Sequence, residues 1–246
     1  MTETKPRTAI VTGASKGIGA AIATRLAADG LNVVVNYASD RTGAEEIADA
    51  IAVANGHAIV AQADVGAPEG VPTLFEAAEA AFGSVDVLIN NAGMMKLAPL
   101  ADVDDDTFDQ HLAVNIGGVF RGLREASRRL ADGGRIVSFS SSVVGAYPPT
   151  YGVYAATKAA VEAMTHVLSK EVAKRGITVN AIAPGPVETK LFMQDKTEEE
   201  IATATGRIPF GRLGQPDEIA GAVSWLVGAD GGWVNGQVIR VNGGMI

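Results

Sequence analysis

Tyr154 and Lys158 are the two residues whose types and spacing most directly suggest chemistry. They stand four residues apart in the run Tyr-Ala-Ala-Thr-Lys, within a segment of helical periodicity. This spacing puts both side chains on one helix face, with Cβ atoms about 5–6 Å apart. A tyrosine with an ordinary pKa is a poor acid or base at neutral pH, and a neighbouring ammonium group lowers that pKa. The pair predicts a proton-transferring tyrosine, although the same spacing alone also occurs without any catalytic role.

A second chemical signal is a glycine-rich turn between an apolar run and a helical pattern near the amino terminus. Its sequence is Thr-Gly-Ala-Ser-Lys-Gly-Ile-Gly over residues 12–19. Gly13 permits a tight turn, Gly17 lets the backbone approach a pyrophosphate, and Gly19 allows close packing of helix on strand. Free N–H groups at the start of the helix attract phosphate. The turn predicts a dinucleotide site with contacts from Gly13, Ser15, Lys16, Gly17, Ile18 and Gly19.

The glycine turn has three residues instead of one between its first two glycines, and Thr-Gly-x-x-x-Gly-x-Gly resembles the motif of the short-chain dehydrogenase/reductase family. The resemblance implies hydride transfer between a nicotinamide and a carbonyl or alcohol carbon. Tyr154 would be the general acid or base, and Lys158 would lower its pKa and anchor the ribose. The family also places a serine at the end of the preceding strand. Ser141 fits that register and the interval to the tyrosine, whereas Ser142 matches the local sequence of some relatives and stays as the alternative.

Further residues stand where the family has its supports and cofactor contacts. Asn115 matches an asparagine that kinks a long helix and holds a water near the lysine, completing an implied catalytic set with Ser141, Tyr154 and Lys158. Asp64 is placed like the residue that bonds the adenine amino group. Beyond the glycine turn, the implied cofactor-binding residues are Asp64, Val65, Asn91, Ala92, Gly93, Tyr154, Lys158, Pro184, Gly185, Val187 and Thr189. The matches run in order through residues 8–244.

The end of the second expected strand favours NADP(H) over NAD(H). An acidic residue there would bond the ribose 2′-hydroxyl of NAD, but residues 36–39 read Asn-Tyr-Ala-Ser, with no carboxylate before Asp40. Lys16 and Arg41 supply positive charge nearby, as in the NADP-preferring members that the sequence resembles. Asp40 is expected to cap the next helix. The expected contacts on this side of the cofactor are Asn36, Tyr37 and Ser39.

The elements that must position these residues are predicted by the hydrophobic pattern. Continuously apolar runs rich in β-branched residues are typical of parallel strands buried on both faces, and they occupy residues 8–12, 32–36, 57–62, 86–90, 135–140, 178–182 and 237–241. Helical periodicity occupies residues 17–30, 43–54, 69–82, 104–130, 151–174 and 216–226. This alternation predicts one α/β domain over residues 1–246, a doubly wound Rossmann-type sheet of seven mostly parallel strands with helices on both faces. The weakly periodic residues 184–211 are expected to form a substrate lid.

Composition excludes several classes of function. The 246 residues include 20 basic and 28 acidic side chains, a net charge of −8 that counts against nucleic-acid binding. Cysteine is absent, and His57, His111 and His166 have no ligand spacing, so no metal site is expected. The first residues lack the apolar core of a signal peptide, and no run approaches the ~18 apolar residues of a membrane span. We therefore expect a cytoplasmic protein without a membrane partner.

The expected substrate pocket is largely apolar, which favours a small apolar carbonyl or alcohol substrate. The same residues could also simply pack the lid. They are Met94, Met95, Leu97, Tyr147, Pro148, Pro149, Tyr151, Leu191, Phe192 and Met193. A 3-oxoacyl-acyl-carrier-protein reductase is one alternative, with Arg175 at one family position for carrier docking but Asp132 at the other. A non-catalytic NADP-sensing module is an alternative of another class, against which the Ser141, Tyr154 and Lys158 set counts.

The carboxyl-terminal residues 231–244 resemble the last strand and tail through which family members form tetramers. A homotetramer is the assembly that this resemblance implies. Asn242 stands where relatives usually carry Asp, which leaves one small polar contact in question.

Overall fold

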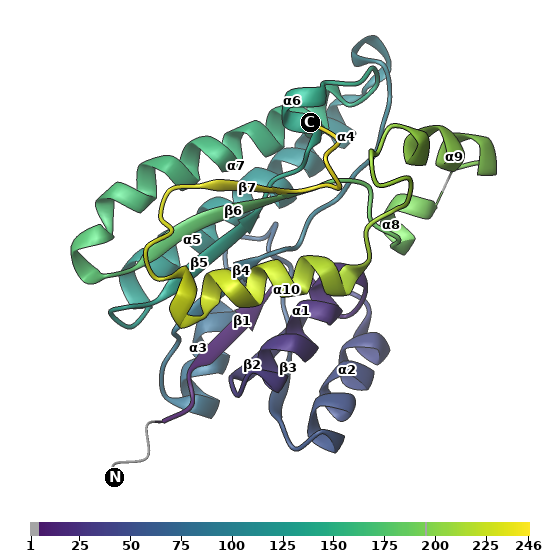
Figure 1. Ribbon diagram of the computed structural model, residues 1–246. Coiled ribbons are helices and arrows are strands. Elements are labelled where there is room, and N and C mark those ends of the chain that lie inside the picture. Colours follow the sequence, from purple (N-terminus) through teal and green to yellow (C-terminus); the bar gives the residue numbers. More distant parts are fainter. Residues whose placement is uncertain (1–4, 195) are drawn as a thin grey trace.

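The computed structural model describes residues 5–194 and 196–246, and within them seven strands form one sheet in the order β3-β2-β1-β4-β5-β6-β7. Every neighbouring pair is parallel. The strands are β1 (Thr8–Val11), β2 (Asn32–Tyr37), β3 (His57–Gln62), β4 (Val87–Asn90), β5 (Arg135–Phe139), β6 (Thr178–Pro184) and β7 (Val238–Val241). The predicted doubly wound α/β sheet is confirmed (Figure 1).

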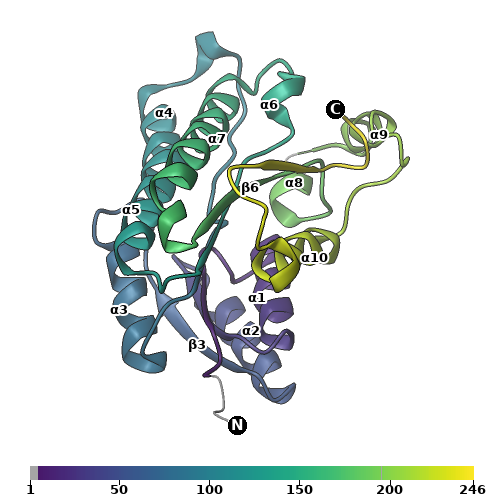
Figure 2. The ribbon, with the colours of Figure 1, turned by 60° about the vertical axis from the view of Figure 1, so that its left-hand side comes forward.

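Two helix layers cover the sheet, one on each face (Figure 2). One layer holds α1 (Gly17–Ala28), α2 (Arg41–Val53) and α10 (Pro216–Val227), and the other holds α3 (Gly70–Phe82), α5 (Val119–Arg129) and α7 (Gly152–Glu171). Shorter elements join them: α4 (Asp105–His111), α6 (Val143–Ala146), α8 (Lys190–Met193), α9 (Glu198–Gly206) and the 3₁₀ turns η1 (Leu100–Asp102), η3 (Ala173–Arg175) and η4 (Ala229–Gly231).

The strands are continuously apolar because each face of the sheet packs against helices. In β2, Val33 and Val35 belong to the core cluster of the α1 side, whereas Val34 between them belongs to the cluster of the α3 side. Successive side chains of a strand point to opposite faces, so a strand covered on both sides has no solvent-facing position to fill with a polar residue. This explains why β-branched runs located the strands.

The long helix expected over residues 104–130 is instead divided by a π-helical segment. The order is α4, then η2 (Leu112–Gly118) in π-helical geometry, then α5. Asn115, at the centre of η2, is fully buried. π-helical turns inside α-helices are rare and often occur at functional sites. The distortion that the family resemblance implies at Asn115 is therefore present as a widened helical turn.

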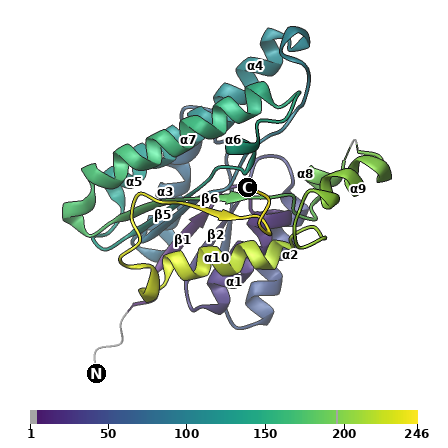
Figure 3. The same ribbon diagram turned by 45° about the horizontal axis from the view of Figure 1, so that its top comes forward.

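All seven strands end at one edge of the sheet, where α8 and α9 project beside the strand ends (Figure 3). The strand order reverses between β1 and β4, and crevices at such reversals are where open α/β sheets bind ligands. In the described part of the chain, no helix combines the length and apolarity that a bilayer crossing requires. The cytoplasmic location stays a prediction.

Candidate active site

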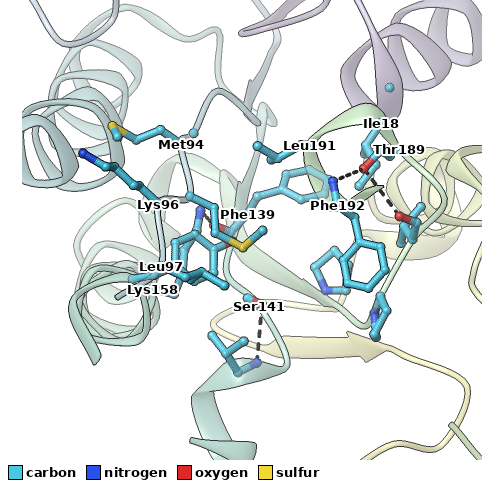
Figure 4. A pocket seen from close by; sticks show the side chains of 18 of the residues that line it. Ile18, Met94, Lys96, Leu97, Phe139, Ser141, Lys158, Thr189, Leu191 and Phe192 are labelled. Carbon is cyan, nitrogen blue, oxygen red and sulfur yellow. Dashed lines mark hydrogen bonds between the residues drawn. The ribbon is translucent and has the colours of Figure 1, made fainter. Parts of the chain in front are cut away.

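A cavity of about 1860 Å³ lies at the carboxyl ends of the strands. Its lining includes every predicted catalytic and cofactor-binding residue except Asn115, which is buried behind the wall. Figure 4 shows Met94, Lys96 and Leu97 on one side, with Lys158 beside Leu97, Leu191 and Phe192 on the other side, and Ser141 at the lower centre. Residues that lie as far apart in the sequence as Gly13 and Thr189 thus meet in one space.

The glycine turn after β1 has the backbone that a pyrophosphate requires. Gly13 and Gly17 have φ values of +62° and +57°, which favour glycine. A Cβ at Gly19 would lie 2.3 Å from the carbonyl oxygen of Gly13, so a side chain does not fit there. No side chain caps the first turn of α1, which leaves its N–H groups for a ligand. The turn fits the phosphates of a dinucleotide.

Residues at the end of β4 hold the glycine turn in place. Asn91 donates from Nδ2 to the carbonyls of Thr12 (2.8 Å) and Gly13 (3.1 Å). The Thr12 hydroxyl accepts from the backbone N–H groups of Asn91 and Ala92, both at 3.0 Å. The predicted contact residues Asn91 and Ala92 therefore also fix the turn, and Thr12 is a support that the sequence analysis missed.

Asn36, which lines the cavity, also supports the glycine turn with its side chain; its contact with the cofactor stays a prediction. Its Oδ1 accepts from the backbone N–H of Gly13 (3.0 Å), and its Nδ2 donates to the carbonyls of Tyr37, Ala61 and Ala63. The side chain is buried, and its polar atoms are occupied by backbone groups. The neighbouring Tyr37 and Ser39 also line the cavity, on the side where the ribose contacts were predicted.

The expected positive charges near Ser39 both have acidic partners. Lys16 Nζ lies 3.5 Å from Asp40 Oδ2, and both side chains are largely solvent-accessible. Asp40 also caps α2, because its carboxylate accepts from the N–H of Gly43, as predicted. Arg41 pairs with Glu45 on its own helix at 2.7 Å. Of Lys16 and Arg41, Lys16 is the one that lines the cavity, and Asp40 partly balances its charge.

Asp64 and Val65 lie at the rim of the cavity beyond β3, where the adenine contact was expected. The Asp64 carboxylate accepts from the N–H of Gly66 at 2.8 Å through Oδ1. Arg121 on α5 donates to the carbonyl of Val65. These bonds hold the loop so that the exposed Asp64 stays at the rim.

Ser141 and Ser142, the two candidates for the catalytic serine, have different surroundings. The Ser141 hydroxyl is hydrogen-bonded to the Tyr154 side chain and accepts weakly from the N–H of Val143 at 3.4 Å. The buried Ser142 hydroxyl donates to the carbonyl of Ala183 (3.1 Å) and accepts from Nδ2 of Asn242 (3.0 Å). Ser141 is therefore the serine next to the tyrosine. Asn242, whose polar contact the sequence left in question, donates to Ser142.

Burial raises the pKa of Tyr154 to about 12, the opposite of the lowering expected from Lys158. Loss of water around the phenol disfavours its charged form, and the hydrogen bond from Ser141 offsets only part of this effect. Tyr151 packs edge-on against the Tyr154 ring, with centroids 6.5 Å apart. Tyr154 is consequently a protonated phenol in this cavity.

Lys158 is buried one helical turn beyond Tyr154, with its Nζ 5.6 Å from the tyrosine ring centroid. The ammonium donates to the carbonyl of Phe139 at 2.8 Å. Burial lowers the pKa of Lys158 to about 8, because desolvation also disfavours a buried ammonium. The Phe139 carbonyl is a hydrogen-bond acceptor that could not be predicted from the sequence, and it fixes the lysine between β5 and the cavity.

Asn115 connects η2 to the segment that follows β4. Its Oδ1 accepts from the N–H of Met94, and its Nδ2 donates to the carbonyl of Met94, both at 2.9 Å. Nδ2 also lies 3.2 Å from the Thr157 hydroxyl on α7. A Cβ placed on Gly93 would lie 3.3 Å from Asn115 Oδ1 and 3.5 Å from Lys158 Nζ, so the glycine keeps the two residues close.

The segment after β6 closes the cavity at the end where the nicotinamide contacts were predicted. Gly185 permits close approach to Asn242, since a Cβ there would lie 2.9 Å from the Asn242 Cα. Val187 is buried and bridges to Gly214. Thr189 caps α8 by accepting from the N–H of Phe192 at 3.2 Å. Thr189 thereby fixes the start of α8, within the segment predicted to be a lid.

The substrate end of the cavity is bounded by the predicted apolar residues, except that Met193 does not line it. Polar lid residues that the sequence analysis did not predict also line it, namely Glu199, Glu200, Thr203 and Arg207, together with Lys96 and Ile246. Because charged residues on an exposed helix are usually only solvated, no pattern in the sequence distinguishes those that face the cavity.

Arg175, one of the two carrier-docking positions considered, is engaged within the chain. Its guanidinium donates to Asp132 at 2.8 Å and to the carbonyls of Ser127 and Leu130. It ends η3, shortly before the amino end of β6, whereas the cavity lies at the carboxyl ends of the strands. Arg175 therefore supports the structure far from the cavity mouth.

Comparisons with known proteins agree with this geometry. The family model described as Enoyl-(Acyl carrier protein) reductase matches residues 13–246. A short-chain type dehydrogenase/reductase of Picea abies is 44% identical, over 98% of this chain and 92% of its own length. An NADPH-dependent aldehyde reductase-like protein of Arabidopsis thaliana is 42% identical, over 98% and 94% of the two chains. The crystal structure of a short chain dehydrogenase from Burkholderia cenocepacia in complex with NADP superposes with a TM-score of 0.93, at 36% identity over 97% of both chains.

Proposed function

The chain belongs to the short-chain dehydrogenase/reductase family, and we propose that it is an NADP(H)-dependent oxidoreductase that interconverts an apolar ketone or aldehyde and the corresponding alcohol. The observation that carries this proposal is the meeting of Ser141, Tyr154 and Lys158 in the cavity that also holds the glycine turn. A passive binding site has no need of a half-buried phenol and hydroxyl beside a buried ammonium.

In the proposed mechanism, Tyr154 is the proton donor to the substrate oxygen. Bound NADPH supplies the hydride that reduces the carbonyl carbon. The pKa of Tyr154, raised to about 12, keeps the phenol protonated at neutral pH, which is the form that reduction requires. Ser141, hydrogen-bonded to Tyr154, orients the same oxygen. Lys158 lies close enough to stabilise the phenolate that proton transfer leaves behind.

Support for NADP(H) as the cofactor comes from the relatives and from one side chain. The Arabidopsis relative is described as NADPH-dependent, and the superposing Burkholderia structure contains NADP. Lys16 is the basic group at the glycine turn that lines the cavity, where it can attract a 2′-phosphate. The predicted contact set, from Gly13 to Thr189, lines the same cavity.

The substrate that we propose is apolar, because methionines, prolines and aromatic residues surround Ser141 and Tyr154. Residues 184–211 would act as the lid over it, with Leu191 and Phe192 facing the cavity (Figure 4). A carrier-protein substrate receives less support, since Arg175 is bound within the chain and lies at the opposite edge of the sheet.

We also propose a homotetramer, as the family resemblance implies. Trp233, which precedes the edge strand β7 in the sequence, is 99% exposed in the isolated chain and is available for a contact between chains. Light scattering tests this assembly, and a monomer at micromolar concentration would contradict it.

The experiment that tests the activity measures oxidation of NADPH by absorbance with a panel of ketones and aldehydes of graded size. The wild-type chain is expected to turn over apolar carbonyls and to prefer NADPH to NADH. Tyr154→Phe is the matched control, since it removes only the donating hydroxyl. Tight NADPH binding without turnover of any carbonyl would instead favour the sensing module.

A further inference from the structure

His111 is a buried histidine that the proposed mechanism does not use. It is the last residue of α4, and its side chain is fully inaccessible to solvent. Its Nδ1 lies 2.8 Å from the carbonyl oxygen of Thr107, and its Nε2 lies 3.3 Å from the backbone N of Lys96. The carbonyl can only accept and the Lys96 N–H can only donate, so the ring carries its proton on Nδ1 and accepts at Nε2.

The segment that His111 holds is a wall of the cavity. Residues 91–99 between β4 and η1 have no regular secondary structure, and their backbone groups therefore need partners from elsewhere. Met94, Met95, Lys96 and Leu97 all line the cavity. Three of them lie on the side of the cavity opposite Leu191 and Phe192 (Figure 4).

The wall segment is held by hydrogen bonds from residues of α4 and η2. Asn115 bonds both backbone groups of Met94, and His111 bonds the N–H of Lys96 two residues later. The Lys96 ammonium donates to the hydroxyl of Thr107 at 2.8 Å. His111 and Asn115 thus hold adjacent points of the same segment, and Asn115 also reaches α7 through Thr157.

Further along, the wall segment meets the turn between Ser141 and Tyr154. The N–H of Ala98 donates to the carbonyl of Thr150 at 3.2 Å. Leu100 also lies close to Gly152, because a Cβ placed on Gly152 would be 2.6 Å from Cδ2 of Leu100. A shift of the wall at Lys96 would consequently move one side of the substrate space relative to the tyrosine.

We propose that His111 is a positioning residue that fixes the wall segment 94–97 and thereby determines which carbonyl substrates bind. Bulky apolar substrates need the wall in place, because they contact it. A small carbonyl held by Ser141 and Tyr154 alone does not. This inference rests on the proposed function, since it assigns the size selection of the same site.

The substitutions His111→Asn and His111→Gln test the bond to Lys96 separately from the bond to Thr107. The amide of Gln reaches about as far as Nε2 and can still accept from Lys96, whereas the shorter Asn reaches only the position of Nδ1 and can donate to Thr107. His111→Asn is expected to raise the KM for 2-tetralone about tenfold, the effect of losing one hydrogen bond to a buried N–H. His111→Gln should restore that KM to within about threefold.

The controls keep folding and chemistry apart from positioning. The KM and kcat for 2,3-butanedione and the Kd for NADPH should be the same in both variants as in the wild type, and thermal melting should show both folded. His57→Asn changes an exposed histidine at the start of β3 and should leave both KM values unchanged.

The possible failures are distinguishable. If the wild-type chain binds NADPH but reduces neither carbonyl, the proposed function fails and the inference falls with it. If the wild type reduces both, only the inference is overturned when His111→Asn and His111→Gln behave alike, when both KM values rise together, or when neither changes.

Discussion

The Nζ of Lys158 lies 5.6 Å from the ring centroid of Tyr154, and burial favours the uncharged form of both groups. The phenol has its pKa raised to about 12 and the ammonium has its pKa lowered to about 8. Desolvation is thus the largest influence on the pKa of each group. A phenolate becomes favourable there only when further positive charge or hydrogen bonds reach the cavity.

Lys158→Met is expected to abolish turnover and to stabilise the folded protein at neutral pH. Because the folded pKa is lowered from 10.5 to about 8, holding the ammonium in the core costs about 3 kcal/mol below pH 8. Between pH 8 and 10.5 only the unfolded chain binds this proton, so wild-type stability rises with pH and the advantage of the variant shrinks. Urea unfolding of both proteins at pH 7 and pH 9.5 measures this. A variant less stable at pH 7 would contradict it.

Tyr154→Phe should bind NADPH as the wild type does and lose turnover by about 10²–10⁴-fold, the usual contribution of a positioned acid. The ring and its edge-on contact with Tyr151 remain, and only the donating hydroxyl is removed. Fluorescence titration gives the NADPH affinity, and steady-state rates give the turnover. Near-wild-type turnover in this variant would overturn the assignment of Tyr154.

Ser141→Ala and Ser142→Ala should separate the two candidate serines. Loss of the Ser141 hydroxyl, which bonds Tyr154, is expected to lower kcat by about 10²–10³-fold, as for other donors to a reacting oxygen. Ser142 bonds Ala183 and Asn242 instead, so its alanine variant should lose about 1–2 kcal/mol of stability and keep most of its kcat. The reverse pattern of rates would make Ser142 the catalytic serine.

Asp40→Asn is expected to tighten NADPH binding about two- to fivefold without improving NADH binding, in proportion to a surface ion pair. The change removes the carboxylate 3.5 Å from Lys16 and keeps a good helix cap on α2. Lys16→Gln should have the opposite effect on NADPH alone, and added salt should reduce both differences. Equal changes for the two cofactors would contradict a role of this pair in recognising the 2′-phosphate.

Gly19→Ala should prevent tight cofactor binding, because its Cβ would lie 2.3 Å from the Gly13 carbonyl and 2.6 Å from Asn91 Nδ2. The glycine turn would have to move away from the end of β4. Gly206→Ala is the matched control, since a Cβ at the end of α9 meets nothing within 4 Å. Calorimetric titration with NADPH should show weak or no binding for the first variant and wild-type affinity for the second.

The sequence predicted the strands well because burial on both faces leaves a clear apolar signal. Val33, Val34 and Val35 show how three consecutive valines result from helix layers on opposite sides. The positions of Ser141, Tyr154 and Lys158 were also predictable, since β5 and α7 fix them. The division of residues 104–130 was not predictable from periodicity, because the same residues satisfy an α-helical pattern.

Electrostatic environment was the other part that residue types could not predict. The proximity of Lys158 suggested a lowered pKa for Tyr154, but burial raises that pKa instead. Asn36 had the right place for a ribose contact, but whether its amide is free depends on where the backbones of Gly13, Ala61 and Ala63 run. The role of His111 was not predictable, because it depends on the backbone groups of Lys96 and Thr107 that the ring bonds in the folded chain.

The π-helical geometry of η2 sets the rotational phase between the two halves of a divided helix. Each i→i+5 bond encloses one residue more than an α-helical turn, so α4 and α5 present faces that a continuous α-helix would not align. Behind this offset, His111 and Asn115 reach the cavity wall while Leu123 and Ala126 pack into the core of the sheet. A one-residue deletion within Leu112–Gly118 would rotate α4 by about 100° relative to α5. Chain length in this segment is therefore constrained as tightly as residue identity.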